Sequence, residues 1–83
     1  RGLPVSLTPL EFRLLVTLVE HPGQVLSADQ LIEHVWGHAD GVSRDQVKLY
    51  VSYLRRKLGQ EVEGFEPIET VRGFGYRYVP PAA

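Results

Sequence analysis

The 83-residue sequence contains no cysteine and no apolar run approaching the roughly 18 residues of a membrane-spanning helix. The lack of cysteine excludes disulfides, zinc–thiolate sites and thiol catalysis, and it is compatible with a reducing, cytoplasmic location. No signal peptide is recognisable, and no membrane partner is expected. A composition with 43% hydrophobic and 23% charged residues is typical of a globular domain. We expect a single domain, residues 1–83, cut from a longer chain because its first residue is not methionine.

An excess of either charge is also lacking, since the formal net charge is −1. The positive charges are nevertheless gathered, because residues 44–58 contain one acid, Asp45, among the basic residues Arg44, Lys48, Arg55, Arg56 and Lys57. Local clusters rather than the total charge attract phosphate groups, so a nucleic acid is a candidate partner. A solvated helix face is the other interpretation of this cluster.

No set of residues typical of an enzyme or a metal site is complete. His34 and His38 are four residues apart, but a glycine lies between them and a third ligand is lacking. Ser43 and Asp45 near His38 could imitate a catalytic triad, yet nothing supplies an oxyanion hole. We therefore expect no enzymatic activity, no metal and no cofactor.

Three capping boxes predict the starts of three helices. Each consists of a hydroxyl residue followed three positions later by Glu or Gln: Thr8 with Glu11, Ser27 with Gln30, and Ser43 with Gln46. Apolar residues at helical spacing follow each box. We expect helices at about 8–21, 27–36 and 43–58, stopped by His21-Pro22-Gly23, by Gly37, and by Gly59 as a C′ residue.

The remaining segments are typical of strands. Residues 4–7 and 24–26 are short extended pieces, and β-branched and aromatic residues flank Arg72-Gly73-Phe74-Gly75. These glycines fit neither a nucleotide-binding loop, which would lead into a helix, nor a repetitive RNA-binding tract. We interpret residues 68–79 as a hairpin whose turn presents Arg72 to a minor groove; a plain solvated turn is the alternative. Three helices followed by this hairpin predict an α+β fold, a winged helix-turn-helix.

The third predicted helix has two different faces. An apolar stripe for the core is formed by Val47, Val51, Leu54 and Leu58. On the opposite face, Gln46 and Arg56 could read base edges in a DNA major groove, and Leu49 could contact thymine methyl groups. The residues that flank this face, where phosphates would run, are Arg44, Lys48, Tyr50 and Arg55.

Three stretches resemble the C-terminal effector domain of OmpR/PhoB-type response regulators: LTPLEFRLLVTLVEHPGQVLSADQLIEHVWG, VKLYVSYLRRKLG and IETVRGFGYRYV. The resemblance covers Leu7 to about Val79. It implies a transcription factor that binds double-stranded DNA and follows a receiver domain phosphorylated by a sensor kinase. The loop 37–42 corresponds to the segment with which family members contact RNA polymerase.

The resemblance also assigns contacts to individual residues. It implies base contacts by Gln46, Leu49 and Tyr53, a minor-groove contact by Arg72, and phosphate contacts by Trp36, Tyr50, Arg55, Thr70 and Tyr76. Trp36 could instead plug the core beside a helix end. The family's consensus DNA site is a poor guide for this chain because three places depart from the family pattern: Ser52-Tyr53 replaces an arginine pair, Asp45 a basic or small polar residue, and Lys48 an acid.

The sequence thus predicts a DNA-binding domain with residues 43–58 in the major groove and the hairpin in the minor groove. We expect a homodimer on DNA, held by contacts of the full-length protein, on half-sites about one helical turn apart. The alternative is a winged helix that binds another protein and no nucleic acid. Acidic interruption by Asp45 and Glu69 would favour that alternative, whereas DNA would be favoured by one continuous basic surface of Lys48, Arg55, Arg56 and Arg72.

Overall fold

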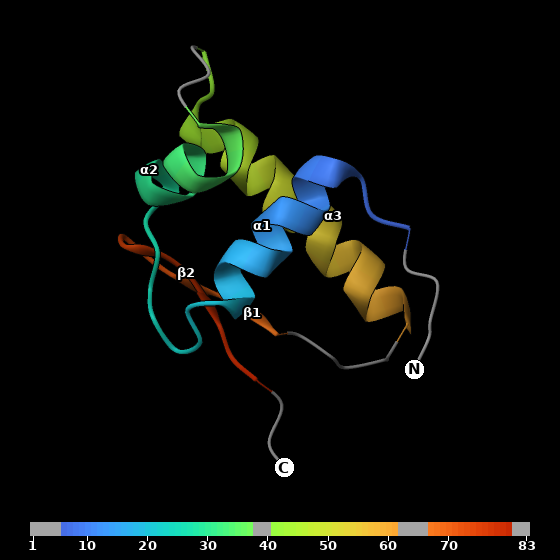
Figure 1. The fold of residues 1–83 in the computed structure, drawn as a ribbon. Helices are drawn as coiled ribbons and strands as arrows, with labels where there is room; N and C mark the ends of the chain where they lie inside the picture. The colour runs from blue at the N-terminus through green and yellow to red at the C-terminus, as the bar shows by residue number, and fades with distance from the viewer. Residues whose placement is uncertain (1–5, 38–40, 62–66, 81–83) are drawn as a thin grey trace.

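The structure is a computed structural model that describes residues 6–37, 41–61 and 67–80. Its elements are α1 (Pro9–Val19), α2 (Ala28–Leu31), η1 (Ile32–Trp36), α3 (Arg44–Glu61), β1 (Ile68–Val71) and β2 (Gly75–Tyr78). Figure 1 shows the helices packed together, with the β1–β2 hairpin beside them. The predicted α+β winged helix-turn-helix is confirmed. Within the described ranges no helix is both long and apolar enough to cross a membrane.

The capping box predicted at the start of α1 is present. Thr8 Oγ1 accepts a hydrogen bond from the Glu11 amide at 3.2 Å, and Glu11 Oε1 accepts one from the Thr8 amide at 2.9 Å. The predicted end at residue 21 is two residues too late. The chain turns after Val19 because the His21 amide bonds to the Leu18 carbonyl at 3.1 Å, and Gly23 follows with a φ of 77°.

The second helix begins as expected, because Ser27 and Gln30 form the reciprocal bonds of a capping box at 3.1 and 2.9 Å. It covers the predicted length, yet its second half, η1, is π-helical. A π-turn is wider than an α-turn, and the apolar spacing did not predict it. The segment ends before Gly37, which has a φ of 71°, a backbone conformation that favours glycine.

The third helix is longer than predicted. Ser43 Oγ accepts a hydrogen bond from the Gln46 amide at 3.3 Å, but α3 continues to Glu61. The prediction that Gly59 ends the helix is therefore wrong. Gly59 lies inside α3 and does not have a positive φ. Glycine in a helix costs only about 1 kcal/mol relative to alanine, so the helix can continue through it once packing has fixed the preceding turns.

The core lies between α1, η1 and α3. Its buried apolar side chains are Leu14, Leu18, Leu26, Leu31, Val35, Val47, Val51, Leu54 and Ile68. The predicted inner stripe of α3 is confirmed, with Leu58 half-buried at its end. The inner face of α3 is thus fixed by the core, and its outer face is turned toward solvent.

A buried ion pair links the start of α1 to the end of α3. The Glu11 side chain is 4% exposed, and Lys57 Nζ lies 2.6 Å from its Oε1 and 2.9 Å from the Ser6 carbonyl. Burial raises the pKa of Glu11, but the hydrogen bonds from Lys57 and from the Thr8 amide outweigh it and leave the pKa below its usual value. The sequence assigned Glu11 only a capping role.

The wing is an antiparallel hairpin in which Ile68 pairs with Tyr78 and Val71 with Gly75. Its stem carries a cross-strand ion pair, with Arg77 Nε donating to Glu69 Oε1 at 2.8 Å. The strand predicted at 24–26 is reduced to one bridge, in which Leu26 exchanges two backbone hydrogen bonds with Tyr76, of 2.8 and 2.9 Å. This bridge attaches β2 to the segment between α1 and α2.

Two predictions fall wholly or partly on residues that the structure does not describe. Of the strand predicted at 4–7, residues 4 and 5 lie outside the described ranges. Ser6 and Leu7 are described but lie in no strand, and no strand of the described residues runs beside them to provide hydrogen-bond partners. The middle of the loop 37–42, residues 38–40, is likewise outside the described ranges.

Candidate nucleic-acid interface

The outer face of α3 presents the predicted reading residues to solvent. Gln46 and Tyr53 are half-buried, Arg56 is exposed, and Leu49 has 47% of its surface exposed although it is apolar. Asp45 and Ser52 are exposed on the same helix. The division of α3 into a buried and an exposed face agrees with the sequence analysis; base contacts by these residues stay a prediction.

Three aromatic side chains form a row from η1 along α3. The rings of Trp36 and Tyr50 meet edge to face at 5.4 Å, and those of Tyr50 and Tyr53 lie 5.6 Å apart. Trp36 is half-buried against the core, as the alternative interpretation of this residue expected. Its Nε1 is buried with no hydrogen-bond partner among the described residues. A phosphate contact by Trp36 stays a prediction.

Arg55 is directed at the wing. Its Nε and Nη2 donate to the Ile68 carbonyl at 3.2 and 3.1 Å, and Nη2 also donates to Thr70 Oγ1 at 2.5 Å. The sequence predicted phosphate contacts for both Arg55 and Thr70, and these stay predictions. The bond between the two side chains was missed because nothing in the local sequence indicates that residues 55 and 70 meet.

The wing presents its turn away from the core. Arg72 and Thr70 are exposed, and Tyr76 is half-buried with its backbone paired to Leu26. Phe74, at the tip, has 73% of its surface exposed. The sequence analysis used Phe74 only as part of the turn, although an aromatic residue between two glycines was the available signal.

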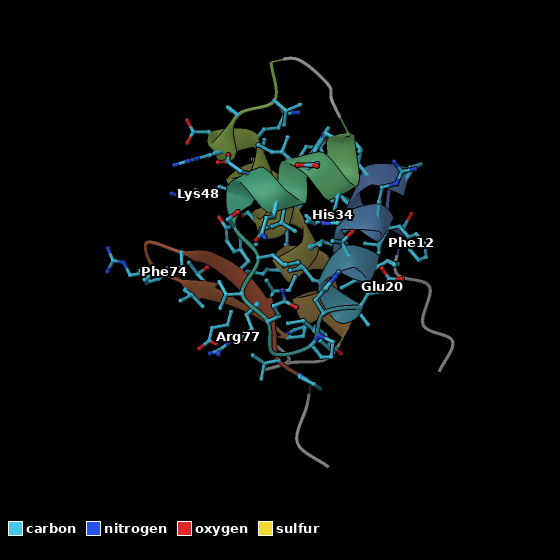
Figure 2. All side chains as sticks on the ribbon, turned by 60° about the vertical axis from the view of Figure 1, so that its left-hand side comes forward. Phe12, Glu20, His34, Lys48, Phe74 and Arg77 are labelled. Atoms are coloured by element: carbon cyan, nitrogen blue, oxygen red, sulfur yellow. The ribbon has the colours of Figure 1, made fainter. Side chains whose placement is uncertain are left out.

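A surface groove of about 430 Å³ separates α3 from the wing and is closed on one side by the start of α2. Arg44, Lys48 and Arg72 line it together with Asp29 and Asp45. Figure 2 shows Lys48 and Phe74, which both line this groove, on the side of the molecule opposite Phe12 of α1 and Glu20, the residue after α1. Helix and wing therefore border one basic groove in which two acids are interspersed.

The two acids of the groove differ in their contacts. Asp29 Oδ2 lies 3.2 Å from Arg44 Nη2, with 70% and 76% of the two side chains exposed. An exposed pair of this kind contributes at most about 1 kcal/mol and is weakened by salt. Asp45 belongs to none of the ion pairs described. Outside the groove, Glu69 is paired with Arg77, so it does not interrupt the surface as an isolated acid.

The predicted basic surface is only partly continuous. Lys48 and Arg72 line the groove and are joined there by Arg44, whereas Arg55 and Arg56 do not line it. Arg56 remains exposed on α3.

The histidine pair considered as a metal site is only partly described. His38 lies outside the described ranges, and the ring of His34 lies 6.0 Å from the ring of His21. Among the described residues, no three His, Asp or Glu side chains gather into a metal site.

Three helices, a wing, and a basic groove between the third helix and that wing define a winged helix-turn-helix domain. The family described as "Transcriptional regulatory protein, C terminal" matches residues 2–78, and the chain belongs to this family. It is therefore an effector domain of the OmpR/PhoB response-regulator type, as its sequence motifs predicted.

Known proteins support this assignment. The chain is 43% identical over 81 residues to the DNA-binding response regulator MtrA of Mycolicibacterium smegmatis, covering 98% of this chain and 36% of MtrA. The DNA-binding domain of CadC from Escherichia coli matches with a TM-score of 0.81 and 38% identity, over 89% of this chain and 70% of that one. The chain spans about a third of the length of the curated relatives it matches.

A solved complex also has this fold. The DNA-binding domain of Klebsiella pneumoniae RstA, in complex with the RstA box, matches with a TM-score of 0.75 and 34% identity. The match covers 92% of this chain and 75% of the RstA chain. This similarity connects the fold of the present chain to a domain crystallised on its DNA.

Proposed function

We propose that this domain binds double-stranded DNA with sequence specificity, placing the outer face of α3 in the major groove and the turn of the wing in the minor groove. The observation that carries the proposal is a groove bordered by both elements, lined by Arg44 and Lys48 from α3 and by Arg72 from the wing. A phosphodiester strand running between the two contacts would pass through this groove, and its charge complements the basic side chains.

The outer face of α3 has the chemistry needed to read base edges. Gln46 can pair with adenine and Arg56 with guanine in the major groove, and the exposed Leu49 can contact thymine methyl groups. Tyr53 borders this face at the end of the aromatic row. These four residues are the proposed base-contacting set.

The proposed phosphate contacts surround that face. They comprise Trp36, Arg44, Lys48, Tyr50, Arg55, Thr70 and Tyr76. Each neutralised phosphate releases counterions, so affinity is expected to fall steeply as salt rises. The net charge of −1 and the acids Asp29 and Asp45 in the groove keep non-specific affinity low. A single domain is therefore expected to bind DNA weakly and to depend on a second copy.

Further partners are proposed from the relatives. MtrA is named a DNA-binding response regulator and is much longer than this chain. By analogy, we propose that the domain acts within a protein that has a receiver domain phosphorylated by a sensor kinase and that binds as a homodimer to half-sites about one helical turn apart. A contact of the loop 37–42 with RNA polymerase belongs to the same proposal.

The test is selection from a randomised duplex pool by the 83-residue chain, followed by fluorescence anisotropy with the selected duplexes at two salt concentrations. The proposal expects an enriched motif and an affinity that falls as salt rises. Flat anisotropy at the lower salt concentration would contradict it, because non-specific contacts are strongest there. Leu49 and the half-buried Tyr50 and Tyr53 would then belong to a surface for a protein partner.

A further inference from the structure

We propose that Arg55 is a positioning residue that fixes the wing relative to α3, so that the major-groove and minor-groove contacts act as one unit. This role rests on the DNA-binding function proposed above. It is distinct from the phosphate contact proposed for Arg55 above, because it acts through the protein's own backbone and reaches the DNA through the position of Arg72.

The guanidinium of Arg55 satisfies a backbone group that the sheet leaves open. Ile68 is 3% exposed, so its carbonyl needs a partner within the protein. The neighbouring Pro67 carbonyl accepts a hydrogen bond of 2.7 Å from the Val79 amide, on the other arm of the hairpin. Since successive carbonyls of a strand point in opposite directions, the Ile68 carbonyl points away from β2. Arg55 approaches this free edge and donates to it through two nitrogens.

The hairpin is attached to the rest of the domain on two sides. On the β2 side, Leu26 pairs with Tyr76, and the Gly23 amide bonds to the Tyr78 carbonyl at 3.0 Å. On the β1 side, the hydrogen bonds between described residues of α3 and of the hairpin all come from Arg55. Loss of Arg55 would leave the wing attached to the α1–α2 connection while removing its hydrogen bonds to the reading helix.

The contact lies between the two reading elements. Arg55 is the neighbour in sequence of Arg56, a proposed base-contacting residue of α3. Its partner Thr70 lies in β1, two residues before Arg72 in the turn. A planar guanidinium can donate to Ile68 and Thr70 at once, which a lysine ammonium cannot reproduce with the same fixed geometry. Charge alone would therefore not replace this contact.

The deciding experiment is a double-mutant cycle on the 83-residue chain. Arg55→Lys and Arg55→Gln are each combined with Arg72→Ala. Binding is measured by anisotropy to a duplex selected from a randomised pool, prepared with A·T-rich or G·C-rich flanks. We expect Arg72→Ala to cost about tenfold in the parent chain on A·T-rich flanks, and less than about threefold once Arg55 is replaced by either residue. Circular dichroism confirms that each variant is folded.

Arg56→Gln is the matched control, because Arg56 is the next residue and is exposed. It is expected to weaken binding while leaving the full effect of Arg72→Ala. If Arg55→Lys keeps the full effect of Arg72→Ala while Arg55→Gln loses about one unit of salt slope, Arg55 acts as a phosphate contact alone and the positioning role is overturned.

A second readout does not need DNA. Amide relaxation and hydrogen exchange of residues 70–73 are measured in the free chain, where Arg55→Gln should raise the mobility of the wing turn and Arg56→Gln should not. If the wing amides of Arg55→Gln are as ordered as those of the parent chain, the inference is overturned even if DNA binding is established. Failure of the parent chain to bind any duplex would instead overturn the proposed function. The proposed coupling between the major-groove and minor-groove contacts would be overturned with it.

Discussion

Gly75 lies directly against the backbone of Leu26. A Cβ atom at position 75 would come within 2.0 Å of the Leu26 carbonyl oxygen, and Gly75 has a φ of 152°. Glycine is thus required where the wing meets the α1–α2 connection, because both the space and the backbone conformation exclude a larger residue.

Replacing Gly75 with alanine should displace the wing and destabilise the fold by about 1 to 3 kcal/mol. Urea unfolding followed by circular dichroism measures the loss. Gly73→Ala is the matched control, since Gly73 also has a positive φ of 82° but a Cβ atom there would meet nothing within 4 Å. Equal losses for the two variants would mean that backbone conformation alone, and not the approach to Leu26, requires glycine at position 75.

Arg72→Ala should weaken DNA binding by about 1 to 2 kcal/mol, mostly on A·T-rich flanks, because a narrow minor groove attracts arginine most strongly. Anisotropy with matched A·T-rich and G·C-rich duplexes measures the difference. The same loss on both kinds of flank would show that Arg72 contacts a phosphate instead.

Gln46→Ala should relax the preference at one base position by about 1 to 3 kcal/mol, because the amide of Gln46 is proposed to read a base edge. Repeating the pool selection with the variant gives its sequence profile. Ser52→Ala, on the same exposed face, serves as the control and should keep the parent profile. If the Gln46 variant keeps it too, a base contact by this residue is refuted.

Lys48→Ala should weaken binding to all duplexes about equally and reduce the salt slope by about one unit, because Lys48 lines the groove as a proposed phosphate contact. Arg13→Ala removes a positive charge from α1, outside the groove, and should change the slope little. A salt slope that is the same for the parent chain and for Lys48→Ala would remove Lys48 from the phosphate-contacting set.

Stability should decrease in acid through Glu11. Its pKa is lowered in the folded state from a usual value of 4.5, so the unfolded chain takes up a proton more readily. The stabilisation by Glu11 is therefore complete above the unfolded pKa and is lost as pH falls through the folded one. Glu11→Gln should cost about 1 to 3 kcal/mol near pH 7 and flatten the acid dependence.

Urea midpoints between about pH 7 and pH 3 test this prediction. Glu33→Gln, an exposed acid in η1, is the control and should keep the acid dependence of the parent chain. An unchanged acid dependence in Glu11→Gln would show that other carboxylates are responsible.

The helix starts were predictable because capping is local. Thr8, Ser27 and Ser43 all accept hydrogen bonds from the amide three residues later, and the sequence contains both members of each pair. The stops were less predictable. Gly59 is a residue type that often ends a helix. A glycine can also continue a helix whose preceding turns are already packed against the core, as it does here.

The candidate site was predictable as a set of faces but not as a set of contacts. The apolar stripe of α3 determined which side chains would be exposed, so Leu49 and Arg56 were found from spacing alone. The bond from Arg55 to Ile68 depends on how β1 approaches α3, which no local pattern encodes. The π-helical turn that carries Trp36 was missed for a similar reason, since it depends on packing.

The cross-strand pair of Glu69 and Arg77 makes the stem of the wing electrically neutral. Of the charged residues between Ile68 and Val79, only Arg72 then remains without a counterpart of opposite sign. The attraction of the wing for a polyanion is consequently concentrated in its turn, at Arg72. An approaching duplex would be drawn to the turn before it reached the stem, which would orient the domain before α3 engages.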